Sequence, residues 1–137
     1  FNTYYKSVFS PLLSEPKNYL YEPNAAILKS GSFSELTHSF NVTKLHEHSH
    51  LYTSSEWVDF PGRTFKIEKT LSYDKKKLKK ELESDKANIS TRNFPKSVIQ
   101  IRKETKIKDG GNIYIFCTTN QQNKRLAIIC SKKSVKS

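Results

Sequence analysis

Three of the four histidines in this chain, His46, His48 and His50, lie within five residues, and Glu47 lies among them. Imidazole and carboxylate groups at such short spacing are the ligands from which zinc and iron sites are built. Alternating histidines would share one face of a strand, but a metal site needs three or four converging ligands and further groups that orient them. The remaining histidine is His38. We therefore expect no metal here, and interpret the cluster as a packed or interface segment.

Motifs that bind nucleotide cofactors or activate a nucleophile are also missing from the sequence. The four glycines form neither GxGxxG nor GxxxxGK[ST], and there is no GxSxG. S-adenosylmethionine, a dinucleotide or ATP therefore has no recognisable site in this chain. We expect no cofactor and no catalytic residue within these 137 residues.

Two cysteines, Cys117 and Cys130, lie in apolar runs that resemble neighbouring strands of one hairpin. A turn near Gln122 and Asn123 would place Cys117 opposite Ile128, and only diagonal to Cys130. Two cysteines are too few for a disulfide framework. We predict buried, reduced thiols and a cytoplasmic protein.

The whole chain has a net charge of +11, and its positive charge is concentrated in the second part. Up to Val58 there are four lysines and five glutamates, whereas from Asp59 onward twenty lysines and arginines accompany eight acidic residues. A basic module after a near-neutral one is typical of a domain that binds a polyanion. A lysine-rich surface that only increases solubility is the alternative.

The basic residues fall into two sets. The first crowds a predicted helix between Lys75 and Lys80, and its simplest interpretation is a solvated face. The second set combines a strand end, a helix and a glycine turn. It therefore offers guanidinium groups and backbone N–H groups that can bind phosphates. The glycines would allow a close backbone approach, or serve only as a turn. The predicted RNA-binding residues are Arg92, Asn93, Lys96, Arg102, Lys103, Lys106, Lys108, Gly110 and Gly111.

The first part of the chain predicts little long regular structure, because three prolines fall within the first 24 residues. Asn24 is placed to open a short helix that ends at Gly31. Ser32 and Glu35 have the spacing of a capping box at the start of an amphipathic helix. Residues 1–57 are therefore predicted to be a linker and a small helical segment.

The second part predicts a small mixed sheet of order β-α-β-α-β-β, with helices on one face, in the α/β (α+β) class. Residues 63–73 alternate as a half-buried strand with Phe65, Ile67 and Leu71 on one face. Asp74 caps a helix, and Pro95 suits the first turn of a second one. The expected elements are strands at 63–73, 86–92, 112–119 and 125–131, and helices at 75–84 and 94–106. We place this basic domain at 58–132 and a flexible basic tail at 133–137.

Four stretches, "SEPKNYLYEPNAAILKSGSF", "LHEHSHLYTSSEWVDFPGRTFKIE", "KANISTRNFP" and "IKDGGNIYIFCTT", resemble the C-terminal region of a Bacteroidetes family of class I S-adenosylmethionine-dependent methyltransferases. The resemblance runs from about Ser14 to Cys130. It implies a methyltransferase domain that comes first, then a ferredoxin-like segment and a THUMP-like domain. THUMP domains are RNA-binding modules of RNA-modifying enzymes. The resemblance therefore implies tRNA or rRNA as a partner, and S-adenosylmethionine as the cofactor of the parent enzyme.

Two functions remain open at this point. The first is a non-catalytic, RNA-binding appendage of a methyltransferase. The second is a protein-interaction module that docks on the methyltransferase domain through Tyr19, Tyr21, Glu22 and Pro23 without contacting RNA. The chain begins with Phe1 rather than methionine, which favours a piece of a longer protein, and no apolar run approaches the roughly 18 residues of a membrane span. We expect no membrane partner.

Overall fold

The structure is a computed structural model that describes residues 12–30 and 33–132. Its elements in chain order are β1 (Tyr19–Pro23), α2 (Ala25–Ser30), α3 (Phe33–Ser39), β2 (Thr43–Lys44), β3 (Tyr52–Ser54), β4 (Gly62–Ser72), α4 (Lys75–Glu81), β5 (Asn88–Arg92), α5 (Val98–Thr105), β6 (Ile113–Thr119) and β7 (Arg125–Lys132). The strands form one seven-stranded sheet in the order β2-β3-β1-β4-β7-β6-β5.

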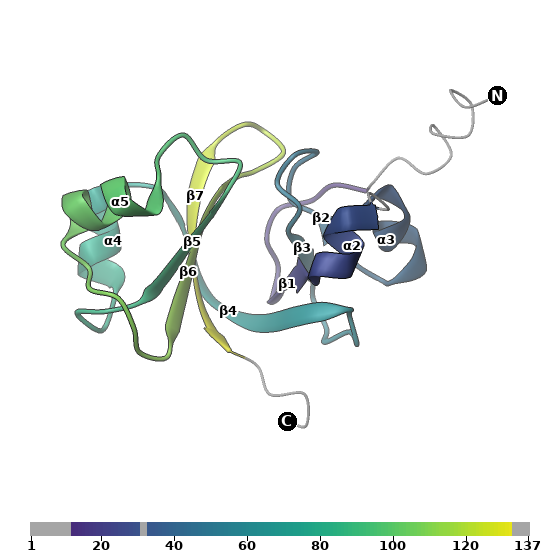
Figure 1. Ribbon diagram of the computed structural model, residues 1–137, viewed down its shortest axis with the longest axis horizontal. Coiled ribbons are helices and arrows are strands. Elements are labelled where there is room, and N and C mark those ends of the chain that lie inside the picture. Colours follow the sequence, from purple (N-terminus) through teal and green to yellow (C-terminus); the bar gives the residue numbers. More distant parts are fainter. Residues whose placement is uncertain (1–11, 31–32, 133–137) are drawn as a thin grey trace.

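The predicted β-α-β-α-β-β order is confirmed from β4 to β7, and so is the mixed α/β class. β5 pairs parallel with β6, and β7 runs antiparallel to both β6 and β4. Figure 1 shows α4 and α5 together on one side of these strands. The two helices pack on this face through buried side chains, among them Leu78, Leu82 and Ile101.

Capping residues set where the two helices begin. The Asp74 side chain accepts a hydrogen bond of 2.8 Å from the backbone N–H of Lys77, as predicted. Ser97 and Gln100 form a reciprocal capping box, so α5 begins at Val98. Pro95 therefore precedes the cap and does not lie in the first turn of the helix, which corrects that prediction.

A β-bulge changes which face of the sheet the side chains of β4 reach. Ile67 pairs with Cys130 and Lys69 with Ile129, so Glu68 is the extra residue. Before the bulge, Phe65 and Ile67 pack in one core cluster; after it, Leu71 packs in the cluster under α4 and α5. The prediction that all three share one face was wrong, because an inserted residue reverses the alternation.

Three strands in the first part of the chain were not predicted. β1 pairs antiparallel with β3 on one side and with β4 on the other, so the sheet continues without a break from the second part into the first. Leu20, Leu45 and Leu51 pack with Phe65 and Phe116 in one shared core cluster. Figure 1 shows β4 extending away from β5–β7 and across to β1.

The helices of the first part agree with the sequence where they are described. The Asn24 side chain accepts a hydrogen bond of 3.0 Å from the Ile27 N–H at the start of α2. α3 buries Leu36 in a third cluster with Tyr21 and Phe60. The predicted cap residues Gly31 and Ser32, the Glu35 side chain and the tail at 133–137 lie outside the described residues.

Both cysteines are buried free thiols, on opposite faces of the sheet. Cys117 pairs with Ala127 rather than Ile128, because the five-residue loop between β6 and β7 shifts the predicted register by one. Burial raises the pKa of the Cys117 thiol to about 12. In the described ranges, no helix combines the length and hydrophobicity needed to span a membrane.

Candidate nucleic-acid interface

Two residues of the predicted RNA-binding set form ion pairs with acidic residues of the same chain. Arg92 forms an ion pair with Glu22, whose side chain is 11% exposed. The Nζ of Lys96 lies 2.7 Å from both carboxylate oxygens of Glu104 and 5.4 Å from the centre of the Tyr73 ring. These cations stabilise contacts between distant segments. Their removal would disturb the fold as well as any ligand contact.

Arg102 also has a structural role. Its guanidinium donates to the backbone carbonyls of Ile107 at 3.1 Å and Ala87 at 3.0 Å, and to Asp109 Oδ1 at 3.0 Å. Only about a fifth of the side chain is exposed. Arg102 therefore joins α5 to the segments that flank it, and its guanidinium is already engaged within the chain.

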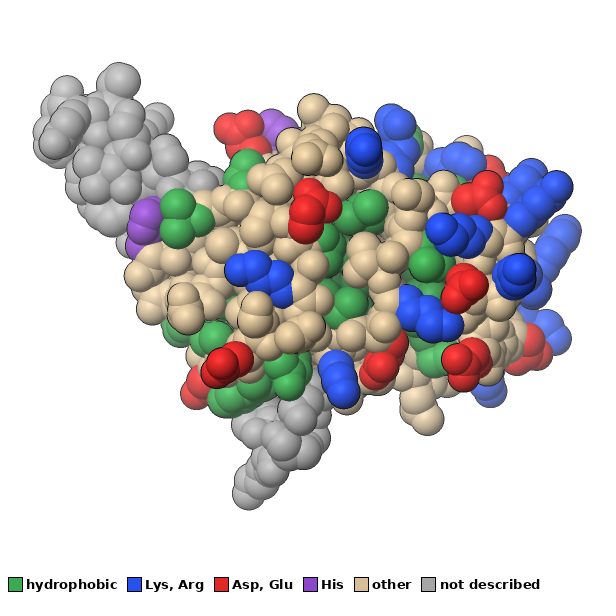
Figure 2. Space-filling view, turned by 180° about the vertical axis from the view of Figure 1, so that it is seen from behind, with side chains coloured by type: hydrophobic (Ala, Val, Ile, Leu, Met, Phe, Trp, Pro, Cys, Tyr) green, Lys and Arg blue, Asp and Glu red, His purple; other side chains and the backbone are tan. Residues whose placement is uncertain are grey.

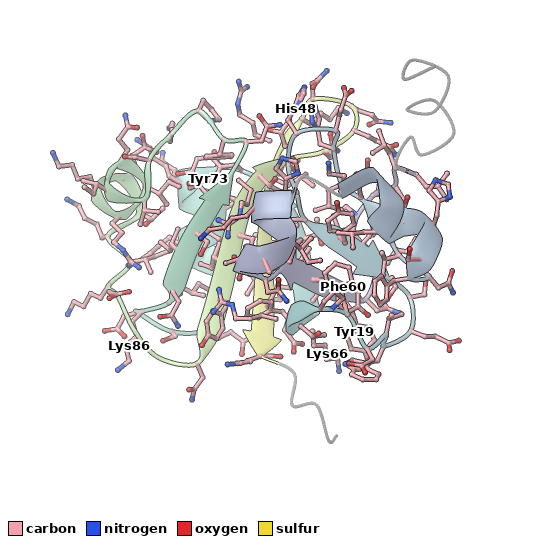
Figure 3. The ribbon with its side chains drawn as sticks, turned by 45° about the vertical axis from the view of Figure 1, so that its right-hand side comes forward. Tyr19, His48, Phe60, Lys66, Tyr73 and Lys86 are labelled. Carbon is pink, nitrogen blue, oxygen red and sulfur yellow. The ribbon has the colours of Figure 1, made fainter. Side chains whose placement is uncertain are left out.

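The predicted set is also divided between the two ends of the sheet. Asn93 follows the last residue of β5, whereas Gly110 and Gly111 precede β6, which runs parallel to β5. Both glycines have positive φ angles, 112° and 83°, so the predicted turn is present. The Cβ position of Gly111 would lie 3.3 Å from the Lys86 side chain. In Figure 3, Lys86 lies at the end of the sheet opposite His48. These residues cannot form one compact patch.

Four lysines of α4, together with Lys106 directly after α5, instead line a groove between the two helices, which we call the lysine groove. It has a volume of about 460 Å³. Its lining residues are Lys75, Lys76, Lys79, Lys80, Glu104, Thr105 and Lys106. Figure 2 shows lysine and arginine side chains gathered over the end of the molecule where α4 and α5 lie. Lys103 and Lys108 are exposed nearby on and after α5.

The sequence of α4 is unfavourable for the helix itself. Its first turn contains no acidic residue, although the positive end of a helix dipole favours carboxylates there. Lys75 and Lys79, like Lys76 and Lys80, are four residues apart, so like charges lie next to each other. The simplest interpretation of α4 is a solvated face, but a solvated helix requires neither of these two unfavourable features.

The single acidic side chain in the lysine groove is already paired. Glu104 accepts hydrogen bonds from Lys96 and, at 3.1 Å, from the Tyr73 hydroxyl. The hydrogen bonds from Lys96 lower the pKa of the Glu104 carboxyl. Among the described residues, Lys76, Lys79, Lys80 and Lys106 form no ion pair, and the charge of Lys75 acts on the nearby Glu104 carboxylate.

The clustered histidines lie in a turn between β2 and β3 and not on a strand. His46 Nε2 lies 2.8 Å from Asn123 Oδ1, and His46 Nδ1 accepts from the His48 N–H at 3.0 Å. Both ring nitrogens of His46 are therefore engaged with other protein groups. Within residues 12–30 and 33–132, no three potential ligand side chains are placed to share a metal ion.

The residues predicted to dock on another domain lie inside this chain. Tyr21 has no exposed surface, and its hydroxyl lies 2.7 Å from Ser54 Oγ. Glu22 and Pro23 are also buried, and Tyr19 is partly buried. Pairing of β1 on both edges explains this burial, so the predicted interdomain contact is wrong for Tyr21, Glu22 and Pro23.

Glu22 has a structural function there. Arg63 Nε donates to one carboxylate oxygen at 2.7 Å, and Arg92 pairs with the other. β1 and β5 are separated by three strands in the sheet order, so the contact between Glu22 and Arg92 requires the sheet to bend until β1 comes close to the edge strand β5.

Lys44, beside the histidine turn, supports a prediction about pH. Burial lowers the pKa of its ammonium to about 8, partly opposed by Glu47. Because the unfolded lysine keeps its proton up to about pH 10.5, the contribution of Lys44 to stability rises between pH 8 and 10.5. We expect the difference in unfolding free energy between Lys44→Met and the wild type to shift by roughly 2–3 kcal/mol in favour of the wild type over this range.

Urea denaturation of both proteins at the two pH values measures this difference. Other groups that titrate in this range, such as Cys117, are present in both proteins, so their contributions cancel in the difference between the two unfolding free energies. A difference that stays constant with pH would contradict the prediction.

The chain matches known protein families. Residues 62–132 match the THUMP domain-like family, and residues 19–61 match a ferredoxin-like domain family. The first match covers more than half of the chain, which therefore belongs to the THUMP domain-like family. No protein of curated function matches the chain.

A solved structure supports the same assignment. The crystal structure of a "putative methyltransferase" from Porphyromonas gingivalis W83 superposes with a TM-score of 0.86 at 36% sequence identity. The match covers 94% of this chain and 33% of that protein, so the chain spans about a third of its length. The resemblance to the THUMP-like region of a Bacteroidetes methyltransferase is confirmed.

Proposed function

We propose that this chain is the RNA-binding module of an S-adenosylmethionine-dependent RNA methyltransferase of the cytoplasm. The module has no catalytic role of its own and presents tRNA or rRNA to the methyltransferase domain of the parent protein. The observation that carries the proposal is the lysine groove, where five lysines line one concavity and none of them forms an ion pair with a described acidic residue. Similarity to a methyltransferase three times as long supports the proposed parent.

The arrangement of the lysines favours a polyanion over simple solubility. Solubility requires only net charge, which scattered lysines supply without cost to a helix. Here the like charges repel one another along α4, and the lysines of its first turn oppose the helix dipole. A bound phosphate backbone would relieve both effects and release counterions.

A second function has one specific observation in its favour. Leu12 and Trp57 are 51% and 37% exposed, and they line a hollow together with Val42 and Val58. Polar residues such as Asn41 and Glu56 also line this hollow. Exposed apolar side chains with polar residues around them suit contact with another protein domain. The chain would then dock on the rest of its parent while the lysines remain solvated.

An RNA titration with charge-matched variants distinguishes the two functions. The first variant, Lys76→Gln/Lys79→Gln/Lys80→Gln, removes three charges from the lysine groove. The control, Lys17→Gln/Lys66→Gln/Lys132→Gln, removes three exposed lysines outside it. Fluorescence anisotropy over a salt series gives the slope of log affinity against log salt.

We expect the groove variant to flatten this slope by about 2, since each lost phosphate contact contributes about 0.7 on a single strand. The control should change it little. The melting temperature of the groove variant should not fall, because its substitutions remove repulsion within α4. Equal losses in both variants would mean diffuse attraction, and no RNA binding by the wild type at low salt would favour the docking function.

A further inference from the structure

A second groove lies at the carboxyl ends of β5 and β6, and we call it the carboxyl-end groove. Its volume is about 620 Å³, within the range of roughly 300–1,000 Å³ typical of small-ligand sites. Three distant segments line it: the histidine turn, the residues after β5, and the loop between β6 and β7. The side chains used below are His46, His48, Asn93, Asn123 and Arg125.

His46 orients two asparagine amides in this groove. Because its Nδ1 accepts the His48 N–H, its Nε2 carries the proton and donates to Asn123 Oδ1. Asn93 Nδ2 makes a longer contact of 3.3 Å with His46 Nδ1. Among the described residues, Asn93 Oδ1 and Asn123 Nδ2 have no further partner. The groove therefore presents one acceptor and one donor on oriented amides.

Both asparagines have left-handed backbones, with φ of 54° at Asn93 and 62° at Asn123. Glycine adopts this conformation most easily, and asparagine tolerates it better than other residues do. Removal of either amide by Asn→Gly thus preserves the local backbone. This property makes the two positions suitable for a clean test.

A planar ring and a cation complete the site. The His48 side chain is 71% exposed, and its ring centre lies 5.6 Å from that of His46. Arg125 is exposed at the start of β7 and has no acidic partner in the described part of the chain. Imidazole and guanidinium planes stack on nucleobases, and guanidinium also binds phosphate.

We propose that the carboxyl-end groove binds one unpaired nucleotide of an RNA strand, a proposal that rests on the RNA binding proposed above. The amides of Asn93 and Asn123 bond the edge of the base, His48 stacks on its face, and Arg125 pairs with an adjacent phosphate. A base inside a duplex cannot present its pairing edge to this groove, so the nucleotide must be unpaired.

Two sets of variants test this site. Asn93→Gly/Asn123→Gly removes both amides and keeps the left-handed backbone. Arg125→Gln and Lys124→Gln each remove one charge from neighbouring positions, but only Arg125 lines the groove. The ligands are single-stranded homopolymeric oligoribonucleotides, a blunt RNA duplex and free nucleoside monophosphates, with affinity measured by fluorescence anisotropy or competition.

We expect the double glycine variant to bind single strands on the order of tenfold more weakly and to lose preference among bases. Arg125→Gln should flatten the salt slope by about 0.7, and Lys124→Gln should do so less. Amide resonances of Asn93 and Asn123 should shift with single strands and not with duplex. If the double variant fails to fold, the proposal is decided by comparing the salt slopes of Arg125→Gln and Lys124→Gln.

Unchanged affinity and base preference in the folded double variant, with RNA binding intact, would overturn this site while leaving the proposed function standing. Equal competition by duplex would also overturn it. If a nucleoside monophosphate binds as tightly as an oligonucleotide, the ligand is a free nucleotide and the strand assignment is wrong. Absence of RNA binding by the wild type would remove the proposed function itself.

Discussion

Phe65→Ala is expected to lower the free energy of unfolding by about 3–5 kcal/mol. Phe65 has no exposed surface, and its ring centre lies 5.0 Å from those of both Tyr114 and Phe116. It packs with Leu20 of β1 in the core cluster that both parts of the chain share. Truncation therefore leaves a cavity between the two parts, and apolar burial is lost on both sides of it.

Urea denaturation followed by circular dichroism measures this loss, with Phe65→Leu as the control. Leucine keeps most of the buried volume, and its cost should be well below that of alanine. We expect a single unfolding transition for the wild type, because the cluster is continuous. A loss below about 1 kcal/mol for the alanine variant would show that Phe65 does not join the two parts.

Gly62→Ala is expected to cost roughly 2–3 kcal/mol through overpacking. A Cβ atom at Gly62 would collide with the Glu22 carbonyl oxygen and lie 2.9 Å from its carbonyl carbon. Both are backbone atoms of β1, which pairs with β4 at this point. No side-chain rotation can relieve the contact, so the strand must move.

Gly111→Ala is the matched control for this prediction. Gly111 has a φ of 83°, but the nearest atom to an added Cβ belongs to the flexible Lys86 side chain, at 3.3 Å. Its cost should be about 1 kcal/mol, from backbone strain alone. Only Gly62→Ala should accelerate hydrogen exchange of the β1 amides. Exchange that stays slow there would mean that β1 accommodates the new methyl group.

Elements with strong local signals were predictable from the sequence. Asp74 caps its helix within three residues, alternation predicted β4, and continuous apolar runs predicted the two hairpin strands. β1 was missed because its "YLYEP" sequence is short and ends in proline, which is typical of loops. The β4 bulge was missed because an inserted residue leaves the surrounding composition unchanged.

The candidate site was harder to predict, because its geometry depends on contacts between distant residues. Arg92 and Glu22 are 70 positions apart, so no local pattern reveals that this arginine is already paired. Asn123 and His46 are 77 positions apart. The lysines of α4 were visible in the sequence, but only the packing of α5 beside them produces a groove.

The continuous sheet has a geometrical consequence. β4, the first strand of the THUMP-like match, pairs along its first half with β1 of the ferredoxin-like match, and the ion pair between Glu22 of β1 and Arg92 of β5 joins two strands that are not neighbours in the sheet. No flexible joint separates the ferredoxin-like part from the THUMP-like part. The distance between the lysine groove and the histidine turn is therefore fixed. Only a ligand long enough to span that distance can contact both.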